Sequence, residues 1–412
     1  MLAEWAREEC ERWHVPGLAV GLLRDGEVET AAAGVRDLER AEPVHPETPF
    51  RIASATKPFT ATLVMTLAQE GRLSLDEPPP GTAARATIRQ LLSHQGGLEP
   101  EWSAPLDGLG DDDEALARLV REEPPSAPVK PGALFAYSNV GYWTVGAAVA
   151  RVCGTTFEEA MRTRVLEPLS LADTGFNSPP GAARGHNQVA PGADEHRPAD
   201  SAYPRVRRPS GGLWSTVGDL LKFAAHHLGS PGPLSRRSVT ALQEPQVATT
   251  DGSYGLGWML GERGGRQVVH HPGSAAGFQS LLLLVPDEQL ALAALANSSR
   301  GNVAIRGLLE RLDLARETVA DATVREEELA AIVGVYRGQG YEAAVRREQG
   351  RLVVELVEVD PFREERVVYP PLRARPVGPR EFELEDGDWR GERIDFPRPG
   401  LMRYGVLAEK VE

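Results

Sequence analysis

The pair Ser54 and Lys57, in the segment Ser54-Ala-Thr-Lys57, sets a hydroxyl and an amine three residues apart at the start of an expected helix. Residues with that spacing lie on the same face of a helix, so the amine can sit beside the hydroxyl. A serine hydroxyl is a weak nucleophile until a neighbouring base takes its proton. Lysine can be that base only when it is neutral, which requires burial or nearby positive charge to lower its pKa. A capped helix with a surface lysine explains the same two positions.

A second group of polar side chains, Tyr137-Ser-Asn139, follows 83 residues after Ser54 and directly precedes an apolar helical segment that begins at Val140. A tyrosine near a lysine can share its proton and suits proton delivery to a leaving group. The Asn139 amide can hold both a lysine and a substrate carbonyl. Taken alone, the segment is equally well explained as a loop beside a helix.

A third group, His271-Pro-Gly273-Ser274, lies on an expected edge strand, where Pro272 is permitted. Gly273 lets a ligand approach the backbone closely. The adjacent His270 and His271 point to opposite faces of a strand. We find no carboxylate or third histidine at ligand spacing, so the sequence predicts no metal site.

The elements that must position these groups follow from periodicity and turn signals. We expect a helix over 2–13, strands over 16–23 and 28–34 across an Asp25-Gly26 turn, and a helix over 54–71. Residues 87–170 are mostly helices and loops, with a helix start near Asp111–Asp113 rather than a calcium site, and residues 178–209 form a long loop. Strands are expected at 254–260, 266–271, 278–285 and 289–296, and short alternating segments from 333 predict an all-β module.

Together the three groups resemble the serine β-lactamase and penicillin-binding-protein superfamily. The likeness is nearest to the class C β-lactamase-like branch, which includes family VIII esterases, D-aminopeptidases and DD-peptidases. It covers about residues 10–300 in order. Further matching segments are Val15-Pro-Gly-Leu-Ala-Val20, Gly71-Arg-Leu-Ser-Leu-Asp76, Ile88-Arg-Gln-Leu-Leu-Ser-His-Gln-Gly-Gly-Leu98, Pro131-Gly132, Glu167-Pro-Leu169, Gly211-Gly-Leu-Trp-Ser-Thr216 and Tyr254-Gly-Leu-Gly-Trp258.

The resemblance implies an α+β fold in which an antiparallel sheet is flanked by helices and joined to an all-helical subdomain. A small C-terminal antiparallel β-barrel of the lipocalin-like kind is expected to follow. We place the catalytic domain at 1–312, a linker at 313–328 and the barrel module at 329–412.

The resemblance also implies roles for individual residues. Ser54 would be the nucleophile, Lys57 with Tyr137 the general-base system, and the backbone N–H groups of Ser54 and Ser274 the oxyanion hole. Asn139 would contact the substrate amide, and His271 and Gly273 would line the same substrate-binding strand. His271 departs from β-lactamases and many peptidases, which carry lysine there. A neutral imidazole is a weaker partner for a substrate carboxylate than an ammonium ion. Arg205, Arg207 and Arg208 could supply positive charge, although a solvated loop is the simpler expectation.

The composition narrows the class of protein. A formal net charge of −14 argues against nucleic-acid binding and against docking on an anionic membrane. The N-terminal segment has no apolar signal-peptide core, no stretch approaches a membrane span, and Cys10 and Cys153 suit reduced thiols, so we expect a cytoplasmic protein.

We therefore predict a serine hydrolase without cofactor or metal that cleaves ester, amide or small-peptide substrates, including D-amino-acid ones, through an acyl-enzyme. The alternatives are a β-lactamase and a catalytically silent penicillin-binding-like protein. A homo-oligomer could form through the C-terminal module.

Overall fold

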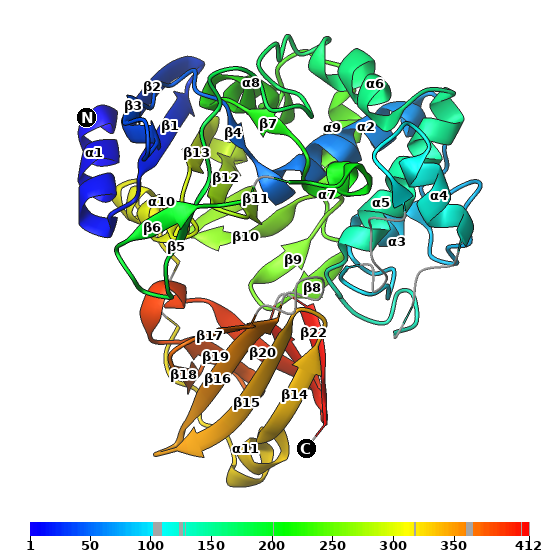
Figure 1. Ribbon diagram of the computed structural model, residues 1–412. Coiled ribbons are helices and arrows are strands. Elements are labelled where there is room, and N and C mark those ends of the chain that lie inside the picture. The colour runs from blue at the N-terminus through cyan, green and yellow to red at the C-terminus, as the bar shows by residue number, and fades with distance from the viewer. Residues whose placement is uncertain are drawn as a thin grey trace.

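The computed structural model describes residues 1–101, 109–122, 127, 129–200, 202–316, 319–359, 366–404 and 406–411 (Figure 1). The helices are α1 Leu2–Trp13, α2 Lys57–Gln69, α3 Ile88–Leu92, α4 Ala115–Glu122, α5 Asn139–Cys153, α6 Phe157–Met161, α7 Arg208–Gly211, α8 Val217–Leu228, α9 Arg236–Leu242, α10 Gly301–Arg311 and α11 Glu326–Ile332. The first strands are β1 Gly17–Arg24, β2 Glu27–Asp37, β3 Glu42–Pro43, β4 Phe50–Arg51, β5 His186–Gln188, β6 His196–Pro198, β7 Trp214–Ser215, β8 Val247–Thr249, β9 Gly252–Tyr254, β10 Met259–Arg263, β11 Arg266–Ala275, β12 Phe278–Val285 and β13 Leu290–Ala296. The C-terminal strands are β14 Gly334–Gly338, β15 Tyr341–Glu348, β16 Arg351–Val359, β17 Arg366–Val368, β18 Leu372–Pro376, β19 Glu381–Leu384, β20 Arg393–Arg398, β21 Leu401–Tyr404 and β22 Val406–Lys410.

A large antiparallel sheet organises the first three quarters of the chain, with strand order β3-β2-β1-β13-β12-β11-β10-β9-β8. Helices α1 and α10 cover one face and α8 packs on the other (Figure 1). Because both faces are covered, β13 is buried along its whole length. That explains why its sequence, Leu-Ala-Leu-Ala-Ala-Leu-Ala, is apolar throughout and does not alternate.

The helical region packs around α2, whose residues 57–67 are all buried. Helices α5, α6 and α9 contact α2, and α3 and α4 pack against α5. The expected helix over 54–71 therefore exists, but its first turn is a separate 3₁₀ helix, η1 Ala53–Thr56. The nucleophile candidate Ser54 lies in this turn and Lys57 begins α2.

The C-terminal strands form a closed antiparallel barrel in the order β15-β14-β22-β21-β20-β19-β18-β16, because β15 also pairs with β16. Strand β17 pairs with β16. The interior is filled with apolar side chains such as Tyr336, Phe382 and Phe396, and Leu329 and Ile332 of α11 complete that core. The predicted fold class, an antiparallel sheet with helices and a small C-terminal barrel, is confirmed.

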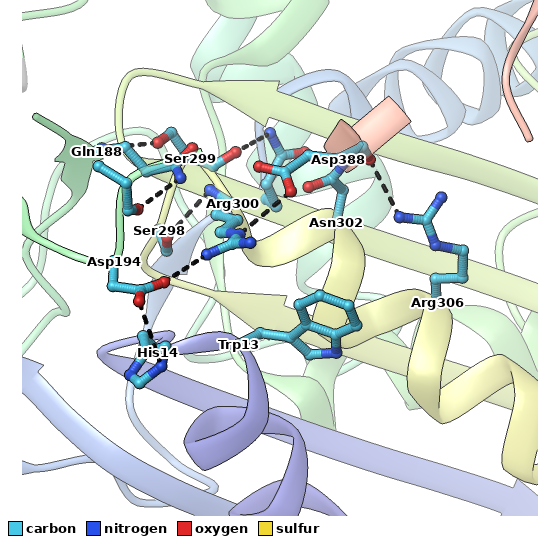
Figure 2. A network of polar contacts seen from close by, with 12 residues as sticks. Trp13, His14, Gln188, Asp194, Ser298, Ser299, Arg300, Asn302, Arg306 and Asp388 are labelled. Carbon is cyan, nitrogen blue, oxygen red and sulfur yellow. Dashed lines mark hydrogen bonds and ion pairs between the residues drawn. The ribbon is translucent and has the colours of Figure 1, made fainter. Parts of the chain in front are cut away.

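A polar network joins the barrel to α10 (Figure 2). The Arg300 guanidinium forms an ion pair with Asp388, with Nε and Oδ1 3.2 Å apart, and a second one with Asp194. The Asp388 carbonyl oxygen accepts hydrogen bonds from Asn302 at 3.2 Å and from Arg306 at 3.0 Å. Asp388 is therefore held through both its side chain and its backbone, which fixes the barrel against the catalytic part of the chain.

Two expectations about the loops and strands are wrong. The strand expected at 254–260 is two strands, β9 and β10, because the chain turns against α2 between them. Gly257 has φ +80 there, and a Cβ on it would lie 2.7 Å from the Cβ of Ala61. The long loop also contains the β5–β6 hairpin and a 3₁₀ turn, η4 Arg205–Arg207. Arg205 is not solvated but pairs with Glu158 at 2.7 Å.

Two of the aspartates in the run Asp111–Asp113 form ion pairs with arginines. Asp112 pairs with Arg118 of α4, and Asp113 pairs with Arg205 at 2.7 Å. As expected, a helix, α4, begins just after this acidic run, at Ala115. None of the helices in the described residues is long and apolar enough to cross a membrane.

Candidate active site

The η1 turn presents Ser54 to solvent. Ser54 is partly exposed, whereas its neighbours Ala53 and Ala55 are buried. Ala53 has φ 47, a left-handed conformation that costs free energy for a residue with a Cβ. The turn is held by hydrogen bonds from the Ile52 N–H to the Leu213 carbonyl at 3.0 Å and from the Leu213 N–H to Thr56 Oγ1. The strained backbone is thus anchored on Leu213, the residue directly before β7.

Lys57 is fully buried beneath Ser54. Its Nζ lies 3.2 Å from Ser54 Oγ, 2.7 Å from Asn139 Oδ1 and 2.9 Å from the Ser210 carbonyl oxygen. Burial lowers the pKa of Lys57 from 10.5 to about 7, and the nearby Glu101 carboxylate opposes this shift. The carbonyl oxygens of Asn139 and Ser210 only accept hydrogen bonds. A neutral amine that donates its two hydrogens to them directs its lone pair toward the Ser54 hydroxyl.

Tyr137 lies on the other side of Lys57. The Lys57 Nζ is 4.8 Å from the Tyr137 ring centroid, and the phenol forms a hydrogen bond with Ser54. Burial raises the pKa of Tyr137, so its hydroxyl is protonated at neutral pH. The His94 ring stacks on Tyr137 at 4.1 Å, and its Nδ1 accepts from the Ser138 N–H at 3.0 Å. His94 therefore fixes the loop that carries Tyr137.

Asn139 is the first residue of α5, and Ser138 caps that helix by accepting from the Gly141 N–H at 3.2 Å. The Asn139 amide uses both ends, because Oδ1 accepts from Lys57 and Nδ2 donates to the Glu101 carboxylate. Burial raises the pKa of Glu101, and Arg207, whose Nη2 lies 3.4 Å from Glu101 Oε2, opposes that shift. Sequence reasoning missed Glu101, because no motif marks a carboxylate 38 residues before its amide partner.

The β11 strand passes directly over the η1 turn. A Cβ on Gly273 would lie 2.1 Å from the Ile52 carbonyl oxygen and 2.4 Å from Ser280 Oγ, so only glycine fits. The next residue, Ser274, is exposed, and its Oγ accepts from Gln279 at 2.9 Å. The close approach sets the Ser274 backbone beside the turn that carries Ser54.

His271 is buried with both ring nitrogens engaged. Its Nε2 lies 3.0 Å from the Tyr254 hydroxyl, and its Nδ1 lies 2.6 Å from the Pro272 carbonyl oxygen. Burial, and secondly the charge of Lys57, lower the pKa of His271 to about 3, so the imidazole is neutral. The ring therefore holds the Tyr254 hydroxyl through its Nε2.

The expectation of an edge strand at Pro272 is wrong, because β11 lies between β10 and β12. The β10 pairing ends at His270, however, which leaves the 271–275 segment of β11 to face η1. A proline is tolerated there because its missing N–H is not required by the β10 ladder.

The seven predicted site residues therefore come from three separate segments, 54–57, 137–139 and 271–274, and the fold gathers these segments around Lys57. Arg51, three residues before Ser54 in the chain, lines a cavity of about 210 Å³. The Arg51 guanidinium lies over the rings of Tyr203 at 4.7 Å and Trp214 at 5.0 Å. Among the described residues, no group of three or more histidine, cysteine or acidic side chains is placed to hold a metal ion.

The model of the family described as Beta-lactamase matches residues 3–316. The chain belongs to the beta-lactamase family. This membership agrees with the superfamily resemblance of the Ser54, Tyr137 and His271 segments. The strands of the C-terminal barrel begin at Gly334 and therefore lie outside the residues that match the family.

Relatives of this beta-lactamase family protein include penicillin-binding protein 4 of Amycolatopsis lactamdurans, 28% identical, with 79% of this chain and 94% of the relative covered. The structure of SurE with D-Leu is similar over 100% of this chain and 98% of that one, with 25% identity and a TM-score of 0.77. A D-amino acid amidase from Ochrobactrum anthropi SV3, complexed with L-phenylalanine amide, is 25% identical over 76% of this chain and 97% of that one, with a TM-score of 0.64. These similarities support hydrolase activity of the serine type in the broad sense.

Proposed function

We propose that the protein is a serine hydrolase that cleaves ester, amide or small-peptide bonds through an acyl-enzyme on Ser54. One observation carries this proposal: the buried Lys57 amine, with its pKa lowered to about 7, lies 3.2 Å from Ser54 Oγ. A lysine held this way is a base near neutral pH, and general-base catalysis needs a pKa close to the working pH.

In the proposed reaction, neutral Lys57 takes the Ser54 proton as Oγ attacks the substrate carbonyl carbon. The backbone N–H groups of Ser54 and Ser274 then stabilise the oxyanion of the tetrahedral intermediate. Tyr137, which is protonated at neutral pH, donates its hydroxyl proton to the leaving group, and protonated Lys57 then returns a proton to the Tyr137 oxygen and becomes neutral again. A water molecule attacks the acyl-enzyme by the same route and releases the acid.

We propose that small D-amino-acid amides, esters or peptides are among the substrates. The titles of two similar structures support this class, since one holds D-Leu and another is a D-amino acid amidase. For His271 we propose a supporting role beneath Tyr254, because both of its ring nitrogens are engaged. Asn139 retains a second amide hydrogen that can reach a substrate carbonyl.

We also propose the division into a catalytic domain at 1–312, a linker at 313–328 and a barrel module at 329–412. The separate hydrophobic core of the barrel supports it, although Val324 already packs against that core. Oligomerisation through the barrel stays a proposal, and it is encouraged by a similar octameric penicillin-binding protein homologue from Pyrococcus abyssi.

A substrate panel tests the proposal directly. Purified protein is assayed with p-nitrophenyl esters, D- and L-amino-acid anilides and nitrocefin, and labelled with a fluorophosphonate. We expect Ser54→Ala to lose hydrolysis and labelling while its circular dichroism stays unchanged. Ser74→Ala, at an exposed serine that follows α2, is the matched control and should behave as wild type. Hydrolysis by well-purified Ser54→Ala at the wild-type rate would exclude Ser54 as nucleophile. A wild-type chain that is neither labelled nor active would favour the silent penicillin-binding-like alternative.

A further inference from the structure

The C-terminal barrel touches the active site at two places. Gln339, in the turn between β14 and β15, accepts a hydrogen bond from the Glu101 backbone N–H at 2.7 Å. Arg403 of β21 donates to the Phe135 carbonyl oxygen at 3.2 Å, and its guanidinium lies 5.7 Å from the Phe135 ring centroid. Phe135 is two residues before Tyr137. Both contacts therefore reach segments that carry, or hydrogen bond to, the base system.

The barrel side of these contacts is held by a buried ion pair and by a second attachment to the catalytic part of the chain. Arg403 is paired with Asp395, and the side chains of the two residues are only 10% and 8% exposed. The Asp388 network at α10 holds the barrel at a separate place (Figure 2). With two separated attachments, the Gln339 turn cannot swing away as a free hairpin.

On the catalytic side, residues 99–101 are each hydrogen bonded to the start of α5. Ser138 Oγ donates to the Glu99 carbonyl oxygen at 2.6 Å, and the Asn139 N–H donates to the Pro100 carbonyl oxygen at 2.8 Å. Asn139 Nδ2 then donates to the Glu101 carboxylate. Because that amide end is occupied by a carboxylate, Asn139 must turn its Oδ1 toward Lys57.

We propose that the barrel is a positioning element of the active site, in which Gln339 holds Glu101 against Asn139 and Asn139 orients the Lys57 amine. The inference rests on the base role proposed for Lys57. It makes Gln339 and Glu101 positioning residues, since neither needs to touch the reacting atoms. A movement of Glu101 away from Asn139 would weaken the negative electrostatic potential at the Lys57 amine.

Several charged or titratable groups lie around Lys57 and Glu101, and the test must separate the effect of Glu101 on the pKa of Lys57 from theirs. Glu101 raises the pKa of Lys57 against the larger effect of burial, and Arg207 faces Glu101 from η4. The other groups around Lys57 and Glu101 are Tyr137, Tyr142, Tyr203, His94 and His271. Protonated phenols and neutral imidazoles leave Glu101 as the charge that acts on Lys57, and Arg207 as the positive charge that acts on Glu101.

The chain has only four lysines, Lys57, Lys130, Lys222 and Lys410, so their side-chain resonances can be followed individually. The full chain is labelled with ¹³C-lysine and titrated by NMR, with Lys57→Arg to assign the Lys57 signal. We expect Glu101→Gln to lower the pKa of Lys57 by about one and Gln339→Ala by about 0.5, because a nearby opposite charge is removed or loosened. In Glu101→Gln, the added Gln339→Ala change should have no further effect on this pKa, since the two act through one carboxylate.

Gln349→Ala, in the β15–β16 turn at the other end of β15, is the matched control and should leave the Lys57 titration unchanged. Gln339→Glu retains the acceptor oxygen and should not lower the pKa of Lys57. An unchanged Lys57 titration in Gln339→Ala would overturn the inference. A raised Lys57 pKa in that variant would also overturn it, because Gln339 would then only exclude water. Since the readout is not hydrolysis, an inactive wild-type chain with these couplings intact would refute the proposed function and not this inference.

Discussion

The acid limb of the pH–rate profile should fall where Lys57 titrates. Burial lowers the pKa of Lys57 from 10.5 to about 7. At pH 7 about half of the molecules then hold a neutral amine, compared with roughly 1 in 3000 for a lysine with its ordinary pKa. Below its pKa the amine is protonated and cannot accept the Ser54 proton. We therefore expect kcat/KM to fall about tenfold for each pH unit below 7.

The informative perturbation is Lys57→Arg. Arginine keeps a positive charge and can donate to Asn139 and to the Ser210 carbonyl, but it does not give up a proton in proteins. Loss of the general base should lower kcat/KM by about 10²–10⁴. Lys57→Ala should lower kcat/KM to a similar extent, although this change removes the charge as well.

The assay is kcat/KM for the best ester of the substrate panel, measured between pH 5 and 9 at constant ionic strength. Lys222→Arg is the matched control, because Lys222 is a half-exposed lysine of α8 that pairs with Asp219 at 2.8 Å. Circular dichroism and thermal unfolding confirm that each variant is folded. If Lys57→Arg retained most of the wild-type kcat/KM with the same acid limb, Lys57 would act only as a fixed charge and the proposed base would be wrong.

Three more predictions follow from contacts in the site. Gly273→Ala should lower kcat about a hundredfold, because its Cβ would meet the Ile52 carbonyl oxygen at 2.1 Å and displace the nucleophile turn; an unaltered rate would show that β11 need not approach that turn. Arg207→Gln should raise the pKa of Glu101, because it removes a guanidinium 3.4 Å from the carboxylate that lowers this pKa; an unchanged Glu101 titration, followed by NMR, would contradict this charge assignment. Nitrocefin should be turned over less efficiently than a short ester or a D-alanyl anilide. The neutral, fully engaged His271 cannot form the charge-assisted bond to a β-lactam carboxylate, which costs about ten- to a hundredfold in binding. A kcat/KM for nitrocefin well above both others would instead support the β-lactamase alternative.

Much of the site is predictable because it depends on local spacing. Ser54 and Lys57 are three residues apart, and this spacing places them on the same face of a helical turn whatever surrounds them. The Tyr137-Ser-Asn139 segment includes its own helix cap, Ser138, so its position at the start of α5 also follows from the sequence. The separate barrel is predictable as well, because its short alternating strands contrast with the apolar strands that precede them. Its closure depends on the pairing of β15 with β16.

The properties that make these residues reactive depend instead on contacts between distant segments. The low pKa of Lys57 requires the burial provided by α2, α5 and α7, which no spacing encodes. Glu101 acquires a role only because its segment pairs with the start of α5, and Gln339 only because the barrel docks beside it. His271 could be read from the sequence as a substrate contact, but the Tyr254 hydroxyl and the Pro272 carbonyl engage its ring. Sequence spacing thus determined which groups can react, while burial and long-range hydrogen bonds decided their protonation and orientation, since both depend on what the folded chain places around each group.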